Sequence, residues 1–360
     1  MADSRIRIHG LTADELTEAC VSLGQPAYRS GQLWNWLYVR RASSWAEMGN
    51  LPVAFRRQLE ERFDLEPTRL LAVTGTAPGT RKVLAGLRDG ECVEEVLIPS
   101  GDRRTLCVSS QVGCRFACAF CASGKGGFCR NLEAGEIVGE VLLGFREYGE
   151  RPTHVVYMGM GEPFDNYDAV LRSIRILNDG KGLAIGARHI TISTSGIVEG
   201  IERLMGEGLQ VELSVSLHAA DDALRDRLMP VNRRYPLSVL MAACARYAAA
   251  TRRIITFEYT LIRGVNDARE HARALAARVK ALPSRINLIP LSPVEGFEGE
   301  TPSGAVIRMF ADVLEKAGVN TTVRASKGAR ISAACGQLRR QAAGSVKRPG
   351  MADPADGGNP

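Results

Sequence analysis

The sequence has no apolar run that approaches the roughly 18 residues needed to cross a membrane. Its first ten residues, MADSRIRIHG, also lack the apolar stretch of a secretory signal peptide. We therefore expect a cytoplasmic protein without membrane association. A strong excess of one charge is missing too. The 46 Lys and Arg residues against 40 Asp and Glu give a net charge of +6, which permits nucleic-acid binding without indicating it.

Three of the nine cysteines, Cys114, Cys118 and Cys121, lie close together in the stretch QVGCRFACAFCASGKGG. In a reducing compartment, metal ligation or thiol chemistry explains such a cluster better than disulfides do. Thiolates suit soft metals, chiefly zinc and iron–sulfur clusters. A structural zinc normally takes four ligands, which Cys129 could complete, whereas three thiolates on a four-iron cluster leave one iron open. Buried, inert cysteines are the third interpretation.

The length of 360 residues, 45% of them hydrophobic, predicts a catalytic domain with a smaller appendage. Apolar residues three and four apart predict helices in an N-terminal domain over residues 1–66, and short alternating runs predict a β-rich connector over 67–103. Strand and helix then alternate through a catalytic domain over 104–340. Residues 341–360 are rich in Pro, Gly and Asp, which predicts a disordered tail. The predicted strands of the catalytic domain are 105–110, 154–159, 189–194, 211–217, 254–262 and 285–291.

Six strand–helix units predict an α/β fold with a parallel sheet, either open or closed into a partial barrel. Ligands bind such sheets at the carboxyl ends of the strands. The segments at those ends carry small and polar residues, namely Gly161, Glu162, Ser193, Ser216, Leu217, His218 and Ser292. A glycine permits close approach of a ligand, and the polar groups can bind an ammonium, ribose or carboxylate. Each has a plainer interpretation, because glycines make turns, serines cap helices and isolated histidines are often structural.

Several motifs together make the chain resemble the RlmN/Cfr family of radical S-adenosylmethionine (SAM) RNA methyltransferases, and most closely its RlmN branch. They extend from about residue 20 to about residue 338, and the stretches CVSSQVGC and AACGQL distinguish this family from other radical SAM enzymes. The matching segments are GQPAYRSGQLWNWLY, VEEVLIP, TLCVSSQVGCRFACAFC, GFCRNLEAGEIVGEV, MGMGEPFDNYDAV, STSGIV, SVSLHAADDALRDRLMPVN, FEYTLIRGVND, INLIP and AACGQL.

The resemblance implies a radical SAM partial (βα)6 barrel with a [4Fe–4S] cluster on Cys114, Cys118 and Cys121. It implies methylation at C2 of an adenosine in 23S rRNA, and in tRNA, with two SAM molecules consumed per methyl group. Cys335 matches the cysteine that carries the methyl group, Cys107 the thiol that later forms a transient disulfide with it, and Glu94 the general base, with Glu95 as the alternative. It further implies an RNA-binding N-terminal domain, a reductant such as flavodoxin, and a monomer.

Three departures from the family pattern leave alternatives open. Ser292 stands where adenine-C2 members carry Asn, Cys129 is an additional cysteine, and the segment before AACGQL lacks the acidic residue often found there. Methylation at C8 of the same rRNA adenosine, as in the Cfr branch, is one alternative. A zinc-dependent RNA-binding protein that uses Cys114, Cys118, Cys121 and Cys129 is the other.

Overall fold

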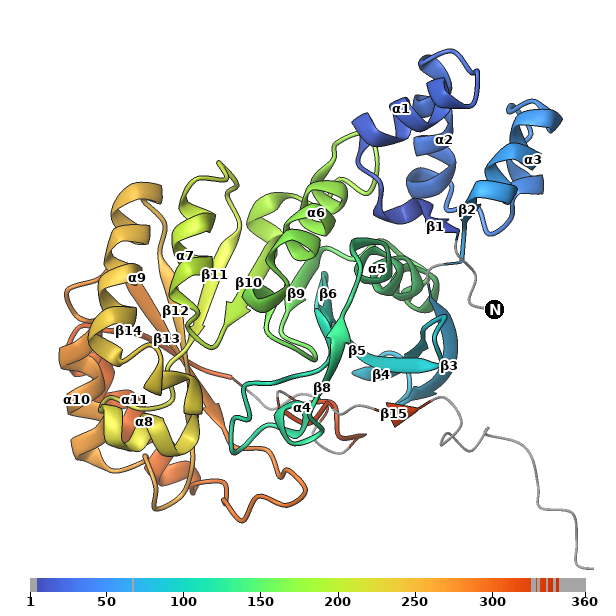
Figure 1. The fold of residues 1–360 in the computed structure, drawn as a ribbon. Helices are drawn as coiled ribbons and strands as arrows, with labels where there is room; N and C mark the ends of the chain where they lie inside the picture. Colours follow the sequence, from blue (N-terminus) through green and yellow to red (C-terminus); the bar gives the residue numbers. More distant parts are fainter. Residues whose placement is uncertain are drawn as a thin grey trace, which may run out of the picture.

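The computed structural model describes residues 5–66, 68–324, 328, 331–334, 336–338 and 341–342. A small helical unit lies at one end of a large curved sheet that is flanked by helices (Figure 1). No helix among the described residues is long and apolar enough to cross a membrane. The helices are α1 (Ala13–Ser22), α2 (Tyr28–Trp34), α3 (Val53–Arg62), α4 (Ala122–Lys125), α5 (Ala134–Tyr148), α6 (Tyr167–Asn178), α7 (Val198–Met205), α8 (Asp222–Leu228), α9 (Leu237–Thr251), α10 (Arg269–Val279) and α11 (Gly304–Lys316).

Most of the strands belong to one 11-stranded sheet with the order β14-β13-β12-β11-β10-β9-β6-β5-β4-β3, and β15 adds to β5. Two short pairs, β1 with β2 and β7 with β8, lie outside this sheet. The strands are β1 (Ile6–Arg7), β2 (Phe63–Asp64), β3 (Arg69–Thr74), β4 (Arg81–Gly86), β5 (Glu91–Ser100), β6 (Arg103–Val108), β7 (Gln111–Gly113), β8 (Phe128–Asn131), β9 (His154–Tyr157), β10 (Ile190–Thr194), β11 (Glu212–Ser216), β12 (Ile255–Leu261), β13 (Ser284–Pro290), β14 (Asn320–Val323) and β15 (Gln341–Ala342).

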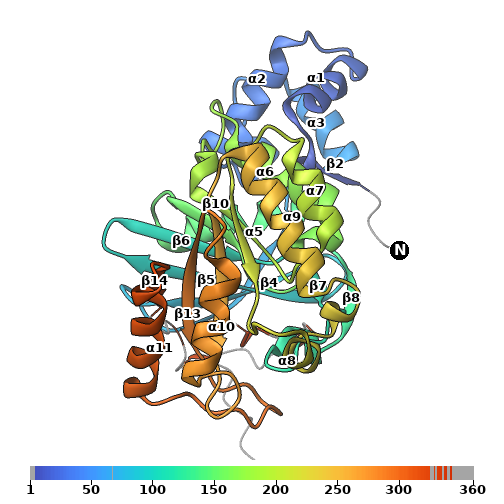
Figure 2. The same cartoon turned by 90° about the vertical axis from the view of Figure 1, so that its left-hand side faces the viewer.

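The parallel part of the sheet runs from β6 through β9 to β14, and its six strands from β6 to β13 are the ones predicted from the sequence. The predicted α/β fold is therefore confirmed. Helices on the outer side cover this part of the sheet (Figures 1 and 2). Two features were not predicted. The chain adds a further parallel strand, β14, and the connector strands β3 to β5 extend the same sheet in antiparallel order through β6.

The sequence of β12 explains how a buried strand can still supply polar groups to a site. All seven residues of ITFEYTL are buried. Successive side chains of a strand point to opposite faces. The polar Thr256, Glu258 and Thr260 therefore share one face, and Phe257 and Tyr259 lie on the other. Glu258 and Thr260 line a cavity inside the curved sheet. The apolar side chains on the other face join the hydrophobic core.

The helical N-terminal unit is anchored to the sheet domain by ion pairs. The carboxylate of Glu136, at the start of α5, is fully buried between two arginines. Nη2 of Arg7 lies 3.0 Å from Glu136 Oε1, and Arg130 of β8 donates to both carboxylate oxygens at 2.8 and 3.0 Å. Arg172 of α6 also pairs with Glu15 of α1. Of the predicted tail, residues 341–342 form β15 on β5, and the remainder lies outside the described residues.

The short ribbon of β7 and β8 leads directly into the cysteine-rich loop, and one glycine makes it possible. Gly113 has φ +76°, and a Cβ there would lie 1.8 Å from the carbonyl oxygen of Gly127. Gly127 has a similar φ of +70°, but nothing lies within 4 Å of its hypothetical Cβ. At position 113 a side chain is disfavoured both by the dihedral angle and by a clash with the backbone. At position 127 it is disfavoured by the dihedral angle alone.

We expect Gly113→Ala to lower the free energy of unfolding by about 3 kcal/mol or more, because the strain of the left-handed region adds to a backbone clash. Gly127→Ala, the matched control, should cost about 1–2 kcal/mol from the dihedral angle alone. Urea denaturation followed by circular dichroism measures both values. Equal losses in the two variants would contradict the steric explanation.

Candidate functional site

The three clustered cysteines lie on the loop between β7 and α4 and line one cavity. The main-chain N–H of Cys114 donates to Gly127 O at 3.0 Å, which ties the loop to the β7–β8 ribbon, and Cys121 immediately precedes α4. Burial raises the pKa of the Cys114 thiol to about 12. Burial also raises the pKa of the Cys118 thiol well above its usual value, so these two thiols need a bound cation to become thiolates, as an iron–sulfur cluster provides.

The chemistry and placement of these cysteines fit a cluster better than a single zinc ion. No group of three or more His, Cys, Asp or Glu side chains in the described part of the chain is arranged to hold one metal ion. A cluster does not require that arrangement, because each thiolate binds a different iron. Cys129, the potential fourth zinc ligand, is exposed on β8, and its Sγ lies 3.8 Å from Glu91 Oε1. It does not line the cavity of the other three.

Glu162 connects the loops after β9 and β10. Its carboxylate accepts hydrogen bonds from the main-chain N–H of Ser195 at 2.6 Å and of Phe164 at 3.1 Å. Burial raises the pKa of Glu162, and these hydrogen bonds oppose the shift. Gly161 precedes it with φ +101°, and a Cβ there would lie 2.7 Å from Gln111 N. Both residues line the cavity of the cysteines, so a ligand carrying an ammonium group could reach the carboxylate there.

The serine and histidine side chains predicted at the strand ends also reach this cavity. Ser193, Ser216, His218 and Ser292 all line it. The Nδ1 of His218 accepts a hydrogen bond from Thr260 N at 2.9 Å, and the ring packs edge-to-face on Phe120 with centroids 4.8 Å apart. Burial lowers the pKa of His218 to about 3. The ring is therefore neutral at physiological pH, and its proton is on Nε2, where it can be donated to a ligand.

Leu217 is the predicted site residue whose side chain does not reach the cavity. It directly follows β11 and is fully buried in the core. Its carbonyl oxygen accepts from Arg225 Nε at 3.1 Å, and its N–H donates to Glu258 O at 3.0 Å. Leu217 thus acts through its main chain on the shape of the loop.

Glu258 and Arg324 line the cavity but did not emerge from the sequence. Glu258 is buried on β12, accepts from Asn287 Nδ2 at 3.0 Å, and lies 3.9 Å from Arg324 Nη1. Burial raises the pKa of Glu258. The sequence does contain a signal for Glu258, which is the single acid in the otherwise apolar and threonine-containing stretch ITFEYTL. An acid within a buried strand is seldom without a partner or a function.

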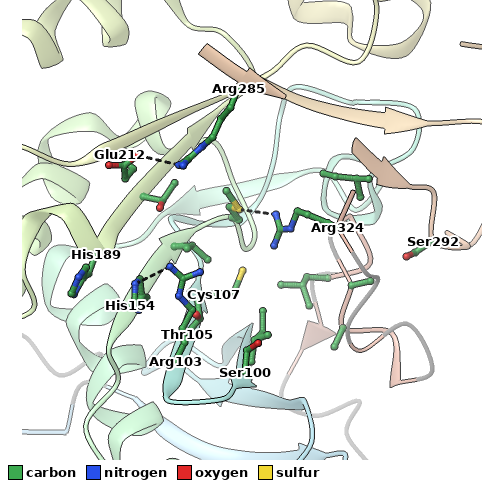
Figure 3. A pocket seen from close by; sticks show the side chains of 18 of the residues that line it. Ser100, Arg103, Thr105, Cys107, His154, His189, Glu212, Arg285, Ser292 and Arg324 are labelled. Carbon is green, nitrogen blue, oxygen red and sulfur yellow. Dashed lines mark hydrogen bonds and ion pairs between the residues drawn. The ribbon is translucent and has the colours of Figure 1, made fainter. Parts of the chain in front are cut away.

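A second cavity of about 630 Å³ adjoins the first and contains Cys107 (Figure 3). The two cavities share Met158, Ile289, Ser292 and Arg324. Its size is within the range of small-molecule sites, so a nucleobase with its ribose could enter. Cys335 lies outside the described residues. Its described neighbours Ala333, Ala334 and Leu338 line the cavity of Cys107, and Gly336 lines that of the clustered cysteines.

The two candidate bases, Glu94 and Glu95, point to opposite faces of β5. Val96 pairs with Cys107 in the register of β5 and β6, so Glu94 and Cys107 share a face. Glu94 is buried and its carboxylate lies 2.8 Å from Lys82 Nζ. Glu95 faces α5, where burial and the nearby Glu140 raise its pKa well above the usual value. The strand geometry therefore favours Glu94 over Glu95 as the residue directed toward Cys107.

Two family models match this chain. The family model for the radical SAM superfamily matches residues 108–276, which defines the class of protein. The model for the ribosomal RNA large subunit methyltransferase N-terminal domain matches residues 6–65. Membership in the radical SAM superfamily implies a four-iron cluster and SAM as cofactors.

Similar proteins share nearly the whole chain. A protein of Moorella thermoacetica described as "Probable dual-specificity RNA methyltransferase RlmN" is 49% identical, over 93% of this chain and 98% of its own. A "Dual-specificity RNA methyltransferase RlmN" of Syntrophobacter fumaroxidans is 45% identical, over 92% and 97%. The crystal structure of a radical SAM methyltransferase from Sphaerobacter thermophilus is 46% identical with a TM-score of 0.90, over 93% and 99%. The chain belongs to the RlmN family of radical SAM methyltransferases.

Replacing Cys114, Cys118 or Cys121 by Ala should abolish retention of a complete cluster, because each thiol contributes to the same cavity. Iron and labile sulfide, measured after anaerobic reconstitution, test this expectation. Cys129→Ala is the matched control and should retain as much iron as the unchanged protein. Loss of iron in the Cys129 variant, or a full cluster in any of the other three, would contradict the assignment.

Proposed function

We propose that this protein methylates C2 of an adenosine in 23S rRNA and tRNA through a methyl group carried on Cys335. The observation that carries the proposal is that two cavities adjoin, one lined by the clustered cysteines and one by Cys107, with four lining residues in common. A methyl group activated in the first cavity would need to move only a short way to meet a base in the second. The names of the relatives, which describe dual-specificity RNA methyltransferases, support RNA as the substrate.

The residues of the first cavity would hold the cofactors. Cys114, Cys118 and Cys121 would bind the [4Fe–4S] cluster, and Glu162, Ser193, Ser216, His218 and Ser292 would bind SAM. When bound, these cofactors supply the one-electron chemistry that activates the methyl group. Such chemistry is needed because adenine C2 is an electron-poor carbon, which cannot attack the methyl group of SAM as a nucleophile. The Nε2–H of His218 is a fixed donor, because Thr260 N occupies Nδ1. Ser292, where adenine-C2 members carry Asn, offers a shorter hydroxyl group in the same wall.

The residues near the second cavity would complete the transfer. After the methylene group on Cys335 has joined adenine, the protein and RNA are covalently linked. The adduct carries one unpaired electron, which would pass to the bound cluster, and Glu94 would accept the proton from the ring carbon. The Cys107 thiolate would then attack the sulfur of Cys335. As the S–S bond forms, the C–S bond breaks, and its electron pair goes to the carbon, which takes up a proton as the methyl group. Two external thiols would then reduce the Cys107–Cys335 disulfide. We further propose a monomer that receives its electrons from a reductant such as flavodoxin.

The identity of the methylated nucleoside tests the proposal directly. Anaerobic incubation of the reconstituted protein with SAM, a reductant and either protein-free 23S rRNA or tRNA, followed by mass spectrometry of the nucleosides, should yield 2-methyladenosine. Because 8-methyladenosine elutes separately, the same measurement would identify the Cfr-type alternative. RNA binding without any methylated nucleoside and without SAM cleavage would instead favour a non-enzymatic RNA-binding protein.

Cys107→Ala should trap the covalent intermediate, because the thiol that releases Cys335 from the methylated base is missing. We expect a protein–RNA adduct that survives denaturing gel electrophoresis and disappears on ribonuclease digestion. Cys335→Ala should give neither adduct nor product. Cys244→Ala is the matched control, since Cys244 is a buried free thiol on α9 outside both cavities.

Normal turnover by the Cys107→Ala protein would rule out its role as the resolving thiol. Methylation by the Cys335→Ala protein would rule out the methyl carrier. Iron content and SAM cleavage, measured on each variant, would show that the cofactor site remains intact.

A further inference from the structure

The Cys107 cavity is lined at the amino-terminal ends of the parallel strands by exposed residues, Arg103 and His189 among them, so it opens to solvent there (Figure 3 labels both residues). The proposed mechanism does not use this opening. His154 is the first residue of β9, and His189 immediately precedes β10. Their imidazole rings stack, with centroids 4.4 Å apart and an interplanar angle of 26°. Both rings line the cavity, as do three arginines of the same opening, Arg103, Arg188 and Arg285.

The hydrogen bonds of His154 fix its ring in a neutral form. Nη2 of Arg103 lies 3.1 Å from His154 Nε2, and a guanidinium can only donate, so Nε2 accepts. The proton is therefore on Nδ1, which donates to Thr153 Oγ1 at 2.8 Å. That hydroxyl accepts a second bond, from Arg104 N, and donates to Arg104 O. Burial and the charge of Arg103 lower the pKa of His154 to about 4, which agrees with a neutral ring.

His154 thus provides a rigid, uncharged support for one face of the exposed His189 ring. His189 itself is exposed, so part of its ring can be reached by a ligand. Recognition of RNA by proteins commonly depends on unstacked bases that lie on aromatic side chains, with arginines nearby for the phosphates. Arg188 is exposed next to this ring, and its Nε donates to Gln210 Oε1 at 3.0 Å.

The N-terminal helical unit lies toward the same end of the sheet, whereas α4 and the cysteine loop lie toward the other (Figure 1). The loop that precedes His189 contacts this unit. At Gly182, a Cβ would lie 2.7 Å from Trp34 Nε1 and 3.3 Å from Tyr38 Cβ. An RNA held by the N-terminal unit would therefore approach the cavity past His189.

We propose that His189, supported by His154, is a stacking platform for the base of a nucleotide that flanks the target adenosine. The proposal rests on RNA being the substrate. Extruding the target adenosine into the cavity leaves its neighbours unstacked at the opening, and an aromatic platform there would compensate for part of that cost. His189 would then contribute to RNA affinity and to the choice of the neighbouring nucleotide, and it would take no part in the reaction itself.

The test uses full-length reconstituted protein and the RNA transcript that it binds. His189→Ala should weaken RNA binding roughly 10- to 100-fold, the loss expected when one base–aromatic stack is removed. The loss should appear in KM, with kcat at saturating RNA changed less than about threefold. His189→Phe should restore the affinity to within about threefold, because it retains the aromatic face without the imidazole nitrogens. His271→Ala on α10 is the matched control and should bind like the unchanged protein.

Two further measurements separate stacking from charge and from catalysis. The affinity of His189→Ala divided by that of the unchanged protein should be the same at low and high salt, since a base stacked on a ring face displaces no counterions from the phosphates. With 2-aminopurine beside the target adenosine, the fluorescence of the bound RNA should be quenched, and His189→Ala should relieve that quenching. Unchanged affinity in His189→Ala, or equal weakness of the Ala and Phe variants, would overturn the proposal. Reduced binding by His189→Ala in a protein that forms no methyladenosine would support the platform while refuting the proposed methylation.

Discussion

The buried guanidinium of Arg225 holds together the loops on which the candidate site depends. The residue is fully buried, and its donors go to Leu217 O, Ser216 O, Ser195 O and Asn232 Oδ1 at 2.7–3.1 Å. A charge in the interior is costly unless its hydrogen bonds are satisfied, and here main-chain carbonyls from the ends of two neighbouring strands satisfy them. Ser195 in turn donates its N–H to Glu162. One cation and one carboxylate thus connect the ends of β9, β10 and β11, which fixes the spacing of the groups that face the cavity.

A second network of charged side chains connects the N-terminal unit to the β7–β8 ribbon. Glu136 receives Arg7 from the N-terminal unit and Arg130 from β8, the strand that pairs with the entry to the cysteine loop. Removing one member of such a buried arrangement leaves another charge uncompensated. The docking of the N-terminal unit and the position of the β7–β8 ribbon are therefore energetically coupled through one carboxylate.

The sequence was sufficient to predict the parallel strands, their helices and the thiol cluster, because periodicity and close spacing are local signals. β14 was missed because its four residues, NTTV, carry little hydrophobic signal. The fusion of β3–β5 with the main sheet depends on long-range pairing, which no local pattern reveals. His154 and His189 are 35 residues apart, and only the parallel pairing of β9 with β10 brings them together. The sequence also left Glu94 and Glu95 as alternatives, and the register between β5 and β6 assigned them to opposite faces.

Two buried acids, Glu95 on β5 and Glu140 on α5, make the stability of the fold depend on pH. Glu95 and Glu140 are fully buried, and burial raises both pKa values well above the ordinary 4.5, so the native state retains protons that the unfolded chain has lost. The native state then binds more protons than the unfolded state, and linkage requires stability to fall as pH increases. The stabilisation from these two carboxyl groups is complete at a pH below their ordinary pKa. It declines as the pH increases from there to their raised pKa values in the native state. Folding is consequently coupled to proton uptake, and these two carboxyl groups limit stability from the alkaline side.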